Sequence, residues 1–106
     1  MAEIILSEWV EPELADIWAT IFADHPDAAD RFLESAQRTF ALLATNPRMG
    51  RARVFQAGRL RGLRSFRVDG FTNYLIFYQP SPKGIHVFYV YHGARDLEAL
   101  FGSGSR

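Results

Sequence analysis

The chain has 106 residues, of which 48% are hydrophobic and 14% aromatic. This is enough apolar material for one compact domain and too much for a disordered chain. The absence of cysteine excludes disulfides and thiolate metal sites. The sequence shows neither a signal peptide nor a membrane-spanning run, so we expect a cytoplasmic protein with no membrane partner. We interpret residues 1–100 as a single domain and residues 101–106 as a flexible tail.

The formal net charge of zero conceals an uneven distribution. The first 34 residues carry nine carboxylates and one cation, Arg31, whereas residues 35–68 carry eight arginines and no acidic residue. Such a basic segment favours binding to nucleic-acid phosphates, to an acidic peptide tail or to an acidic patch on a protein. The alternative is internal pairing with the acidic first helix, although the helical period predicts that its carboxylates point away from the core. Direct DNA binding is disfavoured because no recognition helix carries the charge.

The N-terminal half predicts one strand and two helices. Residues 2–6 are a short apolar run, which is typical of a strand. Apolar residues then recur at spacings of three and four from Val10 to Ile21, which predicts an amphipathic helix. The segment Asp24-His25-Pro26-Asp27 interrupts this pattern, and a second apolar stripe predicts a helix over about residues 27–45. Two helices joined by so short a break predict an antiparallel hairpin. The predicted core of the hairpin includes Trp18, Phe32 and Phe40.

The C-terminal half predicts strands. Residues 47–62 are rich in Gly and Arg and predict a surface loop, with an extended piece near Val54 and Phe55. Three segments dense in aromatic and β-branched residues follow, and they predict a three-stranded meander over residues 63–68, 74–79 and 85–92. Bulky residues on both faces of the last strand indicate either a strand covered on both sides or a sheet face that awaits a partner. A short helical segment is predicted from Gly93 to Leu100. The predicted fold class is α+β, with an N-terminal strand and an antiparallel helix hairpin packed on a small antiparallel sheet.

The sequence offers little catalytic or metal-binding chemistry. His25, His86 and His92 lack a metal-ligand spacing with nearby carboxylates, although the strand period places His86 and His92 on one face. There is no phosphate-binding glycine loop and no serine in a nucleophile elbow. Metal-free RNA cleavage would need an acid, a base and cations, for which His92, Arg64 and Arg67 are the candidates. We predict no catalytic residue, no metal and no cofactor.

Four strings in the order LLATNPRMGR, GLRSFRV, NYLIFYQ and VYHGARDL resemble the ParE branch of the ParE/RelE toxin superfamily. These proteins are the toxic halves of bacterial type II toxin–antitoxin pairs and have also been labelled plasmid stabilisation proteins. The resemblance extends over about residues 3–98. It implies a RelE/ParE-like fold and a toxin that inhibits growth by binding a target, with DNA gyrase as the first candidate. It also implies neutralisation by a ParD-like antitoxin in a hetero-oligomer, in which DNA is contacted only through the antitoxin.

RelE-like relatives instead cleave mRNA on the ribosome, and this is the alternative function. The basic tail with His and Tyr that many of those relatives use is not found after Leu100, where the sequence reads FGSGSR. We interpret Arg95 first as a structural residue that pairs with Asp96 or a helix carboxylate, and second as a target-binding residue. The predicted antitoxin- or target-binding residues are Arg59, Arg61, Arg64, Arg67, Tyr91 and Arg95, with the arginines of residues 59–67 at the rim of an apolar groove.

Overall fold

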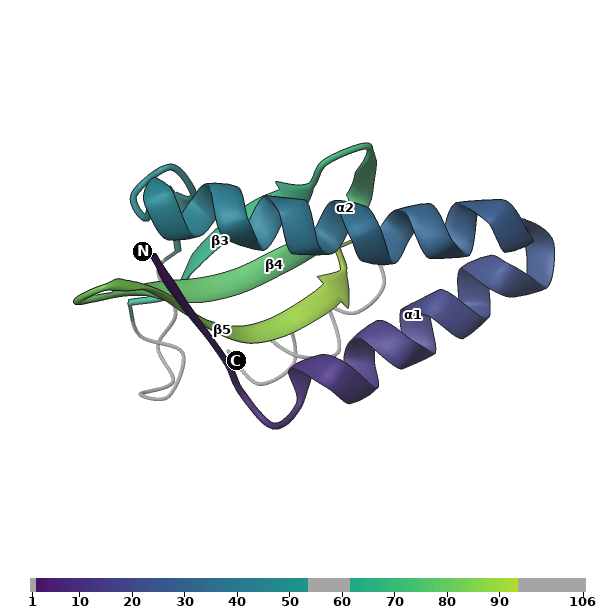
Figure 1. Ribbon diagram of the computed structural model, residues 1–106, viewed down its shortest axis with the longest axis horizontal. Helices are drawn as coiled ribbons and strands as arrows, with labels where there is room; N and C mark the ends of the chain where they lie inside the picture. The colour runs from purple at the N-terminus through teal and green to yellow at the C-terminus, as the bar shows by residue number, and fades with distance from the viewer. Residues whose placement is uncertain (1, 54–61, 94–106) are drawn as a thin grey trace, which may run out of the picture.

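The computed structural model describes residues 2–53 and 62–93 and shows two helices packed on a five-stranded sheet (Figure 1). The predicted α+β fold class is confirmed. The elements in chain order are β1 (Glu3–Leu6), α1 (Val10–Asp24), α2 (Pro26–Thr45), β2 (Arg51–Ala52), β3 (Arg64–Val68), β4 (Phe71–Ser81) and β5 (Gly84–His92). The predicted extended piece near Val54 and the predicted helix after Gly93 lie outside the described residues.

The two helices form the predicted hairpin, with the break at His25. The His25 N–H donates to the Ile21 carbonyl to close α1, and Pro26 occupies the first turn of α2, where its missing N–H has no cost. α2 crosses one face of the sheet, and the tip of the hairpin projects beyond the sheet (Figure 1). Phe32 and Phe40 are buried as predicted. The prediction that Trp18 belongs to the core is wrong, since Trp18 is only half-buried. It lies near the hairpin tip, where it stacks on the exposed Phe22 and its indole N–H donates to the exposed Asp30.

The strand order in the sheet is β1-β5-β4-β3-β2. The predicted meander is present, since β3 pairs with β4 and β4 with β5 in antiparallel fashion. β1 joins the other side of β5 in parallel, so the sheet as a whole is mixed. The position of β5 between β1 and β4 makes it an internal strand, which accounts for its bulky side chains on both faces.

Two hydrophobic clusters lie on opposite faces of the sheet. The larger cluster packs α1 and α2 against residues such as Ile76, Tyr78 and Val87. The second cluster is centred on Leu63, Phe77 and Tyr89, whose exposed fractions are 1%, 0% and 8%. Of the two interpretations of the last strand, burial of residues on both faces supports the covered strand.

A β-bulge in β5 changes which face each side chain occupies. Phe77 pairs with Tyr89 but the next residue, Tyr78, pairs with Val87, so Phe88 has no partner in β4. The N-terminal region stabilises this irregularity. The Ser7 hydroxyl donates to the Phe88 carbonyl at 2.7 Å, and the Glu13 carboxylate accepts from the Val90 N–H at 2.8 Å.

The bulge overturns the prediction that the two histidines of this strand share a face. His86 stacks on Phe88, beside the second cluster, with ring centroids 4.1 Å apart. His92 makes an edge-on contact with Tyr74, which packs against the helix-side cluster. The extra residue between them reverses the alternation, so the two imidazoles cannot act on one ligand.

Candidate functional site

The site is built on the segment that follows α2. Asn46 ends the helix, and the chain passes Pro47 and Gly50 before it enters β2. The hydroxyl of the fully buried Tyr78 donates to the Pro47 carbonyl and accepts from the Gly50 N–H, both at 2.8 Å. Burial raises the pKa of Tyr78, against smaller opposing effects of the Gly50 hydrogen bond and the Arg64 charge. A Cβ at position 50 would overlap the Tyr78 ring, so this close approach requires glycine.

Arg64 holds the same segment from β3. Its Nη1 donates to the Gly50 carbonyl at 2.6 Å and to the Arg48 carbonyl at 3.2 Å. These are charge-assisted hydrogen bonds to neutral oxygens. They provide donors for two carbonyls that lie outside the helices and strands. The structure therefore gives Arg64 an internal contact that fixes the path of the chain into β2.

Arg53 follows β2 and lies over the second cluster. Its Nε donates to the Ser65 hydroxyl at 2.7 Å, and its guanidinium carbon is 5.9 Å from the centre of the Phe77 ring, a cation–π geometry. Partial desolvation lowers the pKa of Arg53, and the neighbouring charge of Arg51 lowers it further. Two cations thus stand close together, and within the described residues the side-chain hydrogen bond of Arg53 goes to a neutral hydroxyl.

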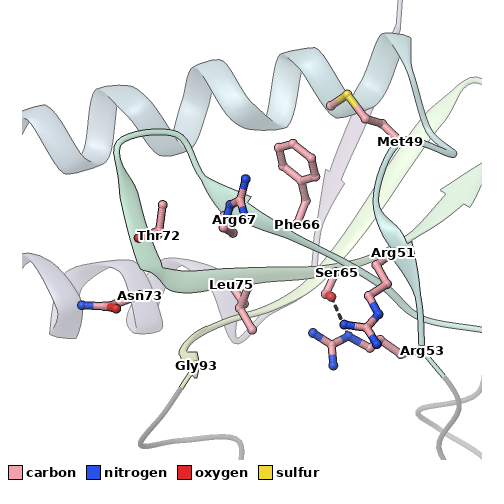
Figure 2. Close-up of a pocket in the computed structure, with 10 residues that line it drawn as sticks. All are labelled: Met49, Arg51, Arg53, Ser65, Phe66, Arg67, Thr72, Asn73, Leu75 and Gly93. Atoms are coloured by element: carbon pink, nitrogen blue, oxygen red, sulfur yellow. Dashed lines mark hydrogen bonds between the residues drawn. The ribbon is translucent and has the colours of Figure 1, made fainter.

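A groove with a volume of about 480 Å³ lies along the β3 edge of the sheet (Figure 2). We call it the arginine groove because three of its lining residues are arginines. Figure 2 shows Arg51, Arg53 and Leu75 on one side of β3, and Phe66 pointing to the other side, toward α2. The described lining residues are Met49, Arg51, Arg53, Ser65, Phe66, Arg67, Thr72, Asn73, Leu75 and Gly93.

Two irregularities of the sheet create this groove. β2 covers only the first part of β3, since Arg51 pairs with Ser65 and Ala52 with Arg64. On the other side of β3, Arg67 pairs with Leu75 whereas Val68 pairs with Phe71, so residues 72–74 have no partner in β3. The outer edge of β3 beyond Ser65 is consequently unpaired within the described residues.

The turn beside the groove is anchored to α2. Gly70 has φ of 80°, which suits the Asp69-Gly70 turn between β3 and β4. The buried Ser35 hydroxyl donates to the Asp69 carbonyl, and the Asp69 N–H donates to the Thr39 hydroxyl at 3.2 Å. These contacts fix one end of the arginine groove on the helix.

The structure describes three of the six predicted site residues, Arg64, Arg67 and Tyr91. Arg67 is exposed and lines the arginine groove, whereas Arg64 is engaged with the segment before β2. Tyr91 is half-buried on the opposite face from the helices and stacks on Tyr89 at 5.2 Å. Arg59, Arg61 and Arg95 lie outside the described residues.

Sequence reasoning missed Arg51 and Arg53 as site residues. Their spacing of two, in a segment with a central alanine, is the period of a strand and could have indicated one shared face. The glycine and arginine content of the segment predicts a loop instead. The two-residue strand forms only because residues more than ten positions away pair with it.

The described residues give no support to two other kinds of site. Within residues 2–53 and 62–93, no three His, Asp or Glu side chains are placed to hold a metal ion. The part of the chain that the structure describes also has no helix that is both long and apolar enough to cross a membrane.

Comparison with known proteins places the chain in context. The family of the "ParE toxin of type II toxin-antitoxin system, parDE" matches residues 4–97. A solved structure described as the chromosomal ParDE TA system from P. aeruginosa has the same fold, with a TM-score of 0.68. The similarity covers 87% of this chain and 96% of that chain at 13% sequence identity. No curated protein sequence matches at a significant level.

Proposed function

The chain belongs to the ParE toxin family of type II toxin–antitoxin systems, and from this premise we propose that it arrests bacterial growth by binding a cytoplasmic target. DNA gyrase is the first candidate target. A cognate ParD-like antitoxin neutralises the toxin in a hetero-oligomer and supplies the contact with DNA. The observation that carries this proposal is the family match over residues 4–97, together with the matching fold.

The geometry of the arginine groove supports binding rather than catalysis. General acid–base catalysis needs groups that donate and accept protons within hydrogen-bond reach of the substrate. None of the described lining residues is His, Asp or Glu. His92, the candidate acid or base, contacts Tyr74 on the helix side of the sheet.

Ribosome-dependent mRNA cleavage is the second candidate, and one observation favours it. Arg51, Arg53 and Arg67 line one groove, where they could hold a scissile phosphate and stabilise its transition state. This reading gives the three cations a role, but it needs proton-transfer groups that the described lining does not supply.

Inducible expression in bacteria tests the proposal. We expect growth arrest with filamentation, and rescue by coexpression of the small reading frame next to the gene. The purified protein should inhibit DNA supercoiling by gyrase and leave ribosome-bound mRNA intact. The control is the same transcript with an early stop codon. Unimpaired growth at confirmed soluble expression would contradict the toxin function, whereas mRNA cleavage without inhibition of gyrase would select the second candidate.

A further inference from the structure

The arginine groove is positively charged, and none of its described lining residues carries a negative charge. Arg51, Arg53 and Arg67 are its charged members, and the other lining residues that the structure describes are neutral. The hydrogen bonds of Arg53 and Arg64 go to hydroxyl and carbonyl oxygens. Cations in such a groove attract and orient an anionic group, and Arg suits carboxylates because its planar fork can donate two hydrogen bonds.

The same groove follows an edge of the sheet that no described strand covers beyond Ser65. The Arg53 N–H donates to the Leu63 carbonyl at 2.9 Å, and Arg51 pairs with Ser65. Backbone groups of an antiparallel pair alternate between inward and outward directions, so Arg67 is the next residue of β3 whose N–H and carbonyl face outward. An unpaired edge of this kind is a template for an added strand.

Apolar side chains complete the surface. Met49 is 40% exposed, and Phe66 and Leu75 are half-buried along the groove. An extended peptide has alternating side chains, so it can present carboxylates to the arginines and apolar groups to Met49 and Phe66 at the same time. A polynucleotide could satisfy the arginines but has no backbone amides and carbonyls to pair with the sheet edge.

We infer that the arginine groove binds an extended acidic peptide segment, which adds to the outer edge of β3 and directs its carboxylates to Arg51, Arg53 and Arg67. This inference rests on the proposed function, in which that segment belongs to the antitoxin. Main-chain pairing provides the register, and the arginines select acidic sequences.

The test uses a ten-residue peptide of alternating Glu and Val, with an alternating Gln and Val peptide and single-stranded (dT)10 as comparison ligands. NMR titration of the full chain should shift the amide signals of residues 64–68 and protect the Arg67 N–H from exchange. The double variant Arg51→Gln with Arg67→Gln should weaken binding of the acidic peptide by at least about tenfold, since it removes two of the three cations that donate charge-assisted hydrogen bonds to the carboxylates. Both side chains are exposed, so the fold should survive.

The matched control is Arg31→Gln with Arg38→Gln, which removes the same charge from exposed positions on α2. It should weaken binding less than about twofold at 150 mM salt, where exposed charges are screened over about 8 Å. Equal losses in both double variants, or amide shifts confined to other elements, would overturn the inference. Tighter binding of (dT)10 than of the acidic peptide would also overturn it and assign the groove to nucleic acid. Growth arrest and rescue are measured separately, so failure of the peptide to bind leaves the proposed function standing.

Discussion

Replacing Tyr78 with phenylalanine isolates the contact that positions the arginine groove. The substitution keeps the buried ring and removes the hydroxyl that joins the Pro47 carbonyl to the Gly50 N–H. Gly50 is buried, so its N–H loses its partner without gaining water. A buried polar group left without a hydrogen bond costs about 1–3 kcal/mol, and the partly buried Pro47 carbonyl also loses its donor. We expect the free energy of unfolding to fall by about 2 kcal/mol or more.

Urea denaturation followed by circular dichroism measures this change, and a thermal melt should show Tm lower by at least about 8 °C, at roughly 4 °C or more per kcal/mol. Tyr74→Phe is the matched control. Tyr74 is a half-buried aromatic residue of the same strand whose described contacts are with the rings of Phe32 and His92. It should change the free energy of unfolding by less than about 0.5 kcal/mol. If both variants lose the same stability, the Tyr78 hydroxyl does not hold the segment and does not position the arginine groove.

Two further predictions concern pH and the bulge in β5. Because burial raises the pKa of Tyr78 above its ordinary value of 10.0, its contribution to stability is complete below pH 10 and declines as pH rises through the folded-state pKa. Urea denaturation between pH 9 and 11 should therefore show that the free energy of unfolding falls more steeply with pH in the parent than in Tyr78→Phe. Parallel curves would mean that ionisation of Tyr78 is not the cause of the fall. Glu13→Ala should destabilise the fold by about 1.5–3 kcal/mol, because it leaves the Val90 N–H without its charged acceptor. Glu13→Gln keeps an acceptor oxygen, so its loss of unfolding free energy in the same assay should be less than half that of Glu13→Ala. Equal losses would mean that the hydrogen bond at the bulge is not the cause.

Local patterns in the sequence were sufficient for the helices and the meander. The spacing of apolar residues and the break around Pro26 predicted both helices, although α1 continues through Asp24 and α2 begins at Pro26, one residue before the predicted start. Turn residues such as Asp69 and Gly70 separated the strands correctly. These features depend on interactions between near neighbours, which a single sequence displays directly.

The features that shape the site depend on distant contacts. The bulge at Phe88 is supported by Ser7 and Glu13, about eighty residues earlier in the chain, and nothing in the string IHVFYVYH reveals it. A one-residue insertion reverses every side chain beyond it, which is why the prediction for His92 was wrong. The arginine groove has the same origin, since β2 is a strand only through its pairing with Arg64 and Ser65.

A strand of two residues cannot hold its own conformation, because two backbone pairings do not offset the entropy of fixing the chain. The positions of Arg51 and Arg53 must therefore be set from outside β2. Tyr78 reaches the segment from the helix-side core, and Arg64 reaches it from β3. Both contacts end on Gly50, immediately before the first arginine of the groove. The hydrophobic core thus fixes the arginine groove through two hydrogen-bonding side chains. We therefore expect a substitution at Tyr78 or Arg64 to weaken binding of the proposed acidic peptide, although neither side chain lines the groove.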